Sequence, residues 1–228
     1  MISLGPESAA PGAAALRRRY TMGAEDYTDN WHVEDSVVTA ARGRGAALGG
    51  GVPSPTAGAV LRSIAASLNA AAVVQAGADS GVSGLYLLEG MAGDGILTSI
   101  EADPESDRAA RESFRESRAG ARVRSINGAP LDVLSRLTDH AYDLMVVGDA
   151  LGAGAAYLEQ ARRLLRPGGA AVFLAVLGDD ERVSDLGQRD DDTMAARHFL
   201  GELAEDPSVV ATLLPVANGT LLVQIPPA

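Results

Sequence analysis

The sequence predicts an α/β fold: a doubly wound, mostly parallel sheet of seven strands that ends in an antiparallel hairpin. From residue 72 onward, short apolar runs alternate with helical patterns, which is typical of a parallel sheet covered by helices on both faces. The run from Ala170 to Leu177 is apolar throughout, which indicates a strand buried on both faces. Ala217-Asn218-Gly219 forms a tight reversal between the last two runs, so this pair is expected to be antiparallel.

The predicted elements follow from these patterns. The strands are expected over residues 72–76, 96–101, 122–126, 142–147, 170–177, 209–215 and 220–225. The helices of this region are expected over residues 82–91, 104–118, 130–137, 153–165 and 191–204. Pro104 lies at the first position of its helix, after Asp103 as the N-cap, which is the arrangement that helix starts favour.

The upstream part of the chain has a different character. Residues 1–47 are expected to be an N-terminal arm with helices, partly disordered because residues 1–14 are rich in Gly, Pro, Ala and Ser. A helix is predicted over Tyr27 to Ala47. Gly49-Gly50-Gly51 and Pro53-Ser54-Pro55 then break the chain, and Thr56 to Leu68 has helical spacing. Residues 48–228 form the main domain.

Composition excludes several functional classes. The net charge of −11 argues against a nucleic-acid surface, because neutralising phosphates needs clustered Lys and Arg. The chain has no cysteine, so it has no disulfide, thiolate metal site or thiol nucleophile. No signal peptide and no apolar run of membrane-spanning length is found, so a cytoplasmic protein without a membrane partner is expected. The expected partner is a small molecule or a second copy of the chain.

The stretch from Ala72 to Asp103 is the most informative part of the sequence. It contains a strand, a glycine-rich turn (Gly77 to Gly81), a helix, a second strand and then the acidic Glu101. Such a unit binds the nucleoside end of a cofactor. In parallel sheets the ligand lies at the carboxyl ends of the strands. Residues 75–79, 101–103, 127–130 and 148–151 are therefore expected to surround one crevice.

The residues within these segments make the prediction of a cofactor site more specific. Residues 73–84 (VVQAGADSGVSG) resemble the first motif of S-adenosylmethionine-dependent O-methyltransferases of the catechol and caffeoyl-coenzyme A type, and residues 97–104 (LTSIEADP) resemble the second. Segments 127–130, 142–144, 164–169 and 214–219 follow in that family's order, and residues 52–55 resemble the segment that closes over the cofactor. The resemblance implies a Rossmann-like class I methyltransferase fold.

The resemblance also implies a set of cofactor-binding residues. Gly77 lets the backbone approach the methionine part of the cofactor, Ser83 holds its carboxylate, and Glu101 takes both ribose hydroxyls. Tyr157 lies where the family often has a tyrosine near the ligand. The full implied set is Val52, Gln75, Gly77, Ala78, Asp79, Ser83, Glu101, Ala102, Gly128, Ala129, Pro130, Gly148 and Tyr157, of which Ala102 and Gly128 to Pro130 would wall the adenine.

Departures from the family pattern concern the metal. The family usually has an acid where this chain has Gln75, and the middle of the glycine turn is Asp79. The three positions of the family's metal ligands are Gly148, Leu174 and Ala175 here. Because a hard cation such as Mg²⁺ needs several oxygen ligands, no metal is expected as a cofactor.

The catalytic group is less defined. Asp149 is the carboxylate nearest to the lost metal position and is a candidate general base. The alternative is a loop aspartate that caps the next helix, because Asp is frequent at helix N-caps. Both interpretations remain open on the sequence.

Three functions are compatible with these features. The first is an S-adenosylmethionine-dependent O-methyltransferase that acts without metal on a small hydroxylated molecule. The second is a catalytically inactive homologue that binds cofactor or dimerises, and the third is a nicotinamide-dependent oxidoreductase. The resemblance further implies a homodimer, paired through the N-terminal helices within residues 27–47.

Overall fold

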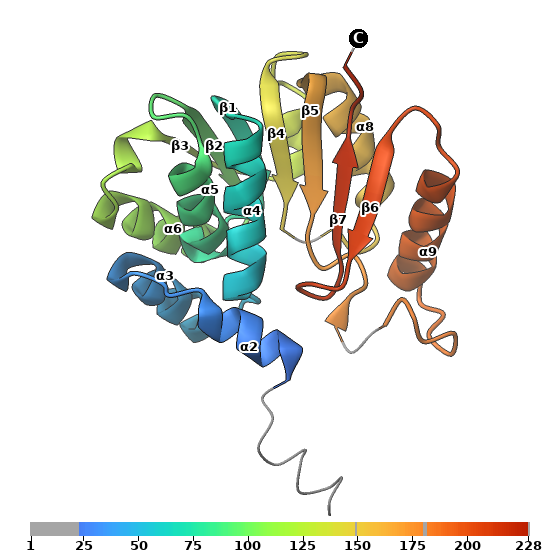
Figure 1. The fold of residues 1–228 in the computed structure, drawn as a ribbon, viewed down its shortest axis with the longest axis horizontal. Coiled ribbons are helices and arrows are strands. Elements are labelled where there is room, and N and C mark those ends of the chain that lie inside the picture. Colours follow the sequence, from blue (N-terminus) through green and yellow to red (C-terminus); the bar gives the residue numbers. More distant parts are fainter. Residues whose placement is uncertain (1–22, 149, 180–181, 228) are drawn as a thin grey trace, which may run out of the picture.

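The computed structural model describes residues 23–148, 150–179 and 182–227. Its seven-stranded sheet has the order β3-β2-β1-β4-β5-β7-β6 (Figure 1). The strands are β1 (Ala72–Ala76), β2 (Ile96–Glu101), β3 (Val123–Asn127), β4 (Tyr142–Val147), β5 (Leu165–Phe173), β6 (Val210–Leu214) and β7 (Thr220–Gln224). Strands β1 to β5 pair in parallel, and β7 runs antiparallel to both β5 and β6. The predicted fold class and the terminal antiparallel hairpin are confirmed.

Helices cover both faces of the sheet. One face carries α3 (Ser36–Ala47), α4 (Pro55–Ser67), α5 (Val82–Gly90) and α6 (Pro104–Glu116), with α2 (Ala24–Trp31) beyond them, and the other carries α7 (Pro130–Leu134), α8 (Gly154–Leu164) and α9 (Asp191–Ala204). Short 3₁₀ turns, η1 (Asp79–Gly81) and η2 (Gly120–Arg122), precede α5 and β3.

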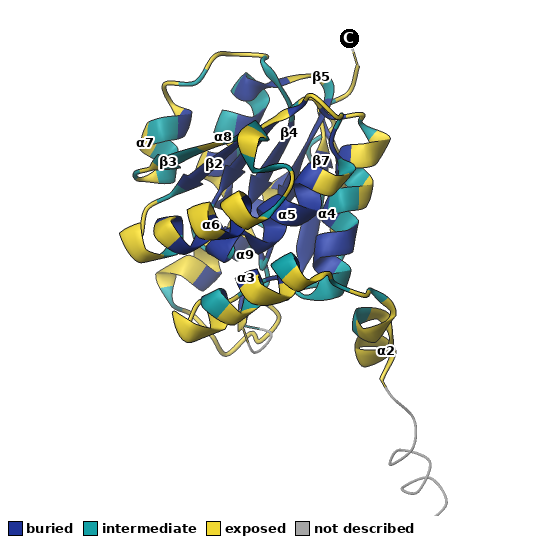
Figure 2. Cartoon of the chain, turned by 90° about the vertical axis from the view of Figure 1, so that its left-hand side faces the viewer, coloured by how far each residue is buried: buried dark blue, intermediate teal, exposed yellow. Residues whose placement is uncertain are grey.

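Alternate strand residues enter two separate apolar cores. Val73 of β1 and Leu144 of β4 pack under α3 to α6, whereas Val74 and Met145 pack under α7 to α9. Both faces of these strands are therefore buried, which is why the sequence shows unbroken apolar runs rather than alternating apolar and polar residues. Figure 2 shows the strands as a buried layer and the outward sides of α3 and α6 as exposed.

The N-terminal helical region differs from the prediction. The single helix expected over 27–47 is two helices, α2 and α3, separated at His32 to Asp35. The Asp35 carboxylate accepts hydrogen bonds from the backbone N–H groups of Val37 and Val38, both at 2.9 Å. This side chain is an N-cap, and it begins a new helix where periodicity alone predicted continuation.

The fifth strand also differs. It was predicted over Ala170 to Leu177 but begins at Leu165 and ends at Phe173. A register shift opposite Tyr142 accommodates the early start. Beyond Phe173, Ala175 adopts a positive φ of 53°, and the amides of Val176 and Leu177 turn to the carbonyl groups of the hairpin turn. The apolar run in the sequence therefore continues to Leu177, beyond Phe173, where the hydrogen-bonded strand β5 ends.

Other predicted boundaries hold to within a few residues. Helix α6 ends at Glu116 rather than near residue 118, α7 ends at Leu134 rather than 137, and β3 is shifted by one residue, which is the usual uncertainty at element ends. The expectation of disorder in residues 1–14 lies outside the described residues. Within the described part of the chain, no helix has both the length and the apolar character needed to cross a bilayer.

Candidate functional site

Hydrogen bonds join the carboxyl ends of the four adjacent strands β3, β2, β1 and β4. The N–H of Gly77, after β1, donates to the carbonyl of Ile100 at 2.9 Å, and that of Gly148, after β4, donates to Ala76 at 2.8 Å. The N–H of Gly128, after β3, donates to the carbonyl of Glu101 at 2.9 Å. The structure therefore brings the predicted loops at 75–79, 101–103 and 127–130 to one edge of the sheet, together with Gly148.

The turn after β1 is the tightest of these segments. Gly77 has a φ of +88° and Gly81 a φ of +97°, a region that residues with side chains rarely adopt. A Cβ atom on Gly81 would also lie 2.8 Å from the Cβ of Ser113 in α6. The glycines thus allow the turn to reverse sharply between the strand and α5.

Glu101 connects the end of β2 to this turn. One oxygen of its carboxylate accepts the backbone N–H of Ala78 at 2.8 Å, and the other accepts that of Asp103 at 3.0 Å. The residue is only half-buried. Two backbone donors hold the carboxylate in one orientation at the strand tips, and its remaining lone pairs are available to a ligand.

Asp79 lies in the same turn and is partly buried. It accepts hydrogen bonds from the Ser83 hydroxyl and from Nε2 of Gln75, the latter at 3.1 Å. Burial, opposed by the bonds from Ser83 and Gln75 and reinforced by the charge of Glu101, raises the pKa of Asp79 to about 7. The family resemblance implied that Ser83 holds a ligand carboxylate, whereas in the structure its hydroxyl donates to a carboxylate of the chain itself.

Gln75 is fully buried beneath this turn. Its Nε2 donates to the carbonyl of Gly77 at 2.7 Å as well as to Asp79. Its Oε1 is buried without a hydrogen-bond partner. The neutral amide of Gln75 thus lies where the family resemblance implies an acid, and the acidic Asp79 is four residues further on.

Residues distant in the sequence support the turn from outside. The Ser113 hydroxyl of α6 donates a hydrogen bond to the Ser80 carbonyl at 2.8 Å. It accepts one from Nη1 of Arg44 in α3 at 3.1 Å. This support could not be predicted from the sequence, because serine and arginine are common on solvated helices and no local pattern indicates the contact.

Val52 reaches the turn through α3. A Cβ atom on Gly45 would lie 2.4 Å from Cγ1 of Val52 and 3.5 Å from Oγ of Ser80, so these two residues flank the same glycine. Arg42 donates to the carbonyl of Pro53 at 2.7 Å and pairs with Glu34. The segment at 52–55 therefore lies beside the glycine turn, and a role of Val52 in cofactor binding stays a prediction.

The remaining predicted residues divide into three groups. Ala102 and Gly128 to Pro130 lie at the tips of β2 and β3, where the amide of Asn127 donates to the Glu101 carbonyl at 2.9 Å. Tyr157 of α8 is buried in the core beneath α7 to α9. Asp149, the candidate base, lies outside the described residues.

Comparison with known proteins identifies the family. A family model described as O-methyltransferase matches residues 52–225. The chain belongs to the O-methyltransferase family. A Mycolicibacterium vanbaalenii protein named "Putative O-methyltransferase" is 37% identical over 223 residues, covering 97% of this chain and 98% of the relative.

Solved structures with the same fold extend this result. A Corynebacterium glutamicum protein is 29% identical with a TM-score of 0.79, covering 95% of this chain and 98% of its own. An O-methyltransferase from Bacillus cereus in complex with SAH is 23% identical with a TM-score of 0.78, covering 88% and 96%. At that identity the second likeness shows the fold alone.

The metal positions of this O-methyltransferase family member hold no oxygen-bearing side chains. Gly148 follows β4, Leu174 is buried in the core, and Ala175 lies in the bend after β5. Among the residues that the structure describes, no three His, Cys, Asp or Glu side chains gather as a metal site. The side chains at these three positions do not fit a divalent metal.

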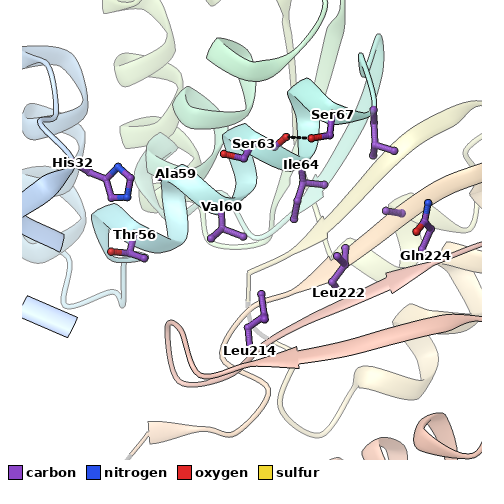
Figure 3. A pocket seen from close by; sticks show the side chains of 12 residues that line it. His32, Thr56, Ala59, Val60, Ser63, Ile64, Ser67, Leu214, Leu222 and Gln224 are labelled. Carbon is purple, nitrogen blue, oxygen red and sulfur yellow. Dashed lines mark hydrogen bonds between the residues drawn. The ribbon is translucent and has the colours of Figure 1, made fainter. Parts of the chain in front are cut away.

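A separate cavity lies between α4 and the terminal hairpin. Its volume is about 490 Å³, and it is lined mainly by apolar side chains. Figure 3 shows Val60 and Ile64 of α4 facing Leu214 and Leu222 of the hairpin, with His32 at one end. None of the predicted cofactor-binding residues lines it, so it is distinct from the strand-tip site.

Proposed function

We propose that this chain is an S-adenosylmethionine-dependent O-methyltransferase that acts on a small hydroxylated molecule without a divalent metal. The observation that carries the proposal is the Glu101 carboxylate, held by two backbone amides beside the glycine turn. Family membership supports the reaction class, and the side chains at Gly148, Leu174 and Ala175 support the absence of a metal requirement.

The donor and acceptor groups at the strand tips suit the cofactor. A carboxylate offers about four lone-pair sites, and Glu101 uses two of them on the backbone. The free sites can accept the two hydroxyls of a ribose. The small residues Ala102, Gly128 and Ala129 would lie beside a flat base, and the turn at Gly77 permits close backbone approach.

Methyl transfer requires positioning more than bond polarisation. When bound, the cofactor supplies an electrophilic methyl group on a sulfonium. The protein has to hold the acceptor hydroxyl in line with the methyl carbon–sulfur bond. It also has to take the hydroxyl proton while the oxygen–carbon bond forms, the carbon–sulfur bond breaks and the thioether S-adenosylhomocysteine leaves. Asp149 directly follows the last glycine of the β4 tip and is the residue we propose to accept that proton.

A second candidate function is a non-catalytic homologue that binds the cofactor or serves in dimerisation. The bond between Ser83 and Asp79 favours it, because a hydroxyl predicted to hold the ligand is already bonded. The nicotinamide-dependent oxidoreductase is disfavoured by the antiparallel β7 and by family membership.

Calorimetry and turnover separate these functions. Titration with S-adenosylmethionine, S-adenosylhomocysteine and NAD should give binding for the two adenosyl compounds only. Methyl transfer to a panel of phenols and catechols, in the presence of EDTA, then distinguishes the enzyme from the inactive homologue. Lack of binding by either S-adenosyl compound at hundreds of micromolar would refute both cofactor-based functions.

The oligomeric state is a further proposal. Tyr27 and Trp31 on α2 are 64% and 69% exposed, and such aromatic side chains often anchor interfaces. We propose a homodimer that pairs through α2 and α3, and light scattering coupled to size exclusion would detect it.

A further inference from the structure

The turn after β1 holds a carboxyl group that has only neutral hydrogen-bond donors. Ser83 and Gln75 both donate to Asp79, and the charged residue that acts on it is Glu101, which has the same sign. In the described part of the chain, no arginine or histidine forms an ion pair with Asp79. The charged groups of the packed helices α3 and α6 at this point pair with each other, Arg44 with Glu112 and Glu116.

Gln75 provides an independent observation. Its Oε1 is fully buried and has no hydrogen-bond partner, which is unfavourable for a polar atom. Flipping the amide would place this oxygen against the carbonyl of Gly77 and the carboxylate of Asp79, so the assigned orientation is the favourable one. The cluster therefore contains more acceptors than donors, and carries an excess of negative charge.

Such a cluster suits a cation with several N–H donors and repels an anion. A second carboxylate at the Ser83 hydroxyl would face Asp79 at close range with no compensating charge, and like charges at that distance are unfavourable. A primary ammonium instead supplies the missing charge and up to three donors. The methionyl tail of the cofactor carries both groups, so the cluster distinguishes between them.

We propose that Asp79 is the acceptor for the α-ammonium of the cofactor's methionyl tail, and that the Ser83 hydroxyl orients Asp79 instead of binding the tail's carboxylate. This inference rests on the proposed function. It defines a ligand class: adenosyl sulfonium or thioether compounds with an amine-bearing tail, for which the carboxylate contributes little to binding.

Three thioether probes that differ only in the tail test the proposal. S-adenosylhomocysteine has both charged groups, its decarboxylated analogue has the amine alone, and 5′-methylthioadenosine has neither. By calorimetry on the full chain at pH 8, the first two should bind within about threefold of each other. The third should bind about tenfold or more weakly, as expected for loss of one charged hydrogen bond.

Two variants locate the effect. Asp79→Asn should weaken both amine-bearing probes about tenfold and leave 5′-methylthioadenosine unchanged. Ser83→Ala should change the affinity for S-adenosylhomocysteine by less than about threefold. Asp94→Asn, which removes the same charge from an exposed turn at the other edge of the sheet, should change none of the three affinities. Melting curves confirm that each variant is folded.

The opposite results are equally clear. If S-adenosylhomocysteine binds at least tenfold more tightly than its decarboxylated analogue, and Ser83→Ala removes that preference, Ser83 binds the carboxylate and the proposal is wrong. It is also wrong if Asp79→Asn leaves the amine-bearing probes unaffected or strengthens S-adenosylhomocysteine. Failure of all three probes to bind the unmodified chain would instead refute the proposed function itself.

Discussion

The backbone N–H of Ala78 donates to the Glu101 carboxylate at 2.8 Å, which fastens the turn after β1 to the end of β2. The two residues are 23 positions apart: Ala78 lies in the turn after β1, and Glu101 ends β2, the parallel neighbour of β1. A bond of this kind to a charged acceptor contributes about 1.5–3 kcal/mol. The acid that we propose to bind the ribose therefore also holds the cofactor turn in place.

Glu101→Gln should weaken binding of the cofactor whether or not the ligand carries the methionyl tail. The amide keeps the size of the side chain but removes the charge and one acceptor, so the ribose hydroxyls and the amides of Ala78 and Asp103 compete for fewer lone pairs. Affinity for both S-adenosylhomocysteine and 5′-methylthioadenosine should fall about tenfold or more, because both contain the ribose. Calorimetry measures both.

The matched control is Glu105→Gln in the exposed first turn of α6, which should leave both affinities within about twofold. An unchanged affinity in Glu101→Gln would contradict the ribose assignment. A loss confined to S-adenosylhomocysteine would show that Glu101 acts on the tail instead.

Asp79 should make the stability of the protein depend on pH. Its pKa is about 7 in the folded protein, against 3.8 as the unperturbed value. Between these values the unfolded chain is ionised while the folded protein retains the proton, so stability falls as pH rises from about 4 to 7. Above pH 7 the ionised group carries the full penalty, on the order of 2 kcal/mol after allowance for solvent screening of this partly exposed residue.

Asp79→Asn removes this titration while keeping an oxygen for the Ser83 hydroxyl. The variant should match the unmodified protein at pH 4 and exceed its stability at pH 8, as measured by denaturant unfolding at both pH values. The Asp94→Asn variant should show an equal difference from the unmodified protein at both. A stability gain in Asp79→Asn that is the same at pH 4 and pH 8 would mean that Asp79 does not titrate in this range.

The strands and the location of the site could be predicted from the sequence because their causes are local. Apolar runs mark strands that are buried on both faces, and glycines at 77 and 81 mark a turn that needs positive φ. The capping of α3 by Asp35 was missed, since an N-cap inside an otherwise helical pattern gives a weak signal.

Contacts within the site were harder to predict. The role predicted for Ser83 came from a family position at which the neighbouring turn residue is not an acid. In the folded protein Asp79 reaches the Ser83 hydroxyl, which the order of residues does not indicate. The bond from Ser113 to Ser80 spans 33 residues, and it depends on how α6 packs on η1. Such contacts are consequences of packing between elements, which residue patterns along the chain do not encode.

Gly58→Ala should destabilise the protein by more than its helical position suggests. Alanine is favoured over glycine in helices by about 1 kcal/mol, but a Cβ atom here would lie 2.3 Å from the ring of Tyr86. That ring is anchored by a hydrogen bond from its hydroxyl to Glu34 at 2.8 Å, and burial together with this bond raises the pKa of Tyr86. We expect a net loss of about 1–3 kcal/mol from overpacking.

Gly43→Ala in the exposed part of α3 is the control, because a Cβ atom there meets nothing within 4 Å. It should stabilise the protein by about 0.5–1 kcal/mol. Thermal melts of the two variants should therefore shift in opposite directions. A stabilised Gly58→Ala would show that Tyr86 can leave α4 without cost.

Cofactor binding and any methyl transfer should be independent of divalent metal. In place of carboxylates and amides, the three positions offer a hydrogen at Gly148, a buried isobutyl group at Leu174 and a methyl group at Ala175. Mg²⁺ takes oxygen ligands in near-octahedral geometry, and waters alone would leave it bound no better than in bulk solution.

Addition of Mg²⁺ or EDTA should then change the affinity for S-adenosylhomocysteine, and the turnover of any phenol that proves to be a substrate, by less than about twofold. A clear requirement for Mg²⁺ in either measurement would show that other groups supply the ligands, with Asp149 the first to replace by alanine, because it adjoins the position where the family places its first metal ligand.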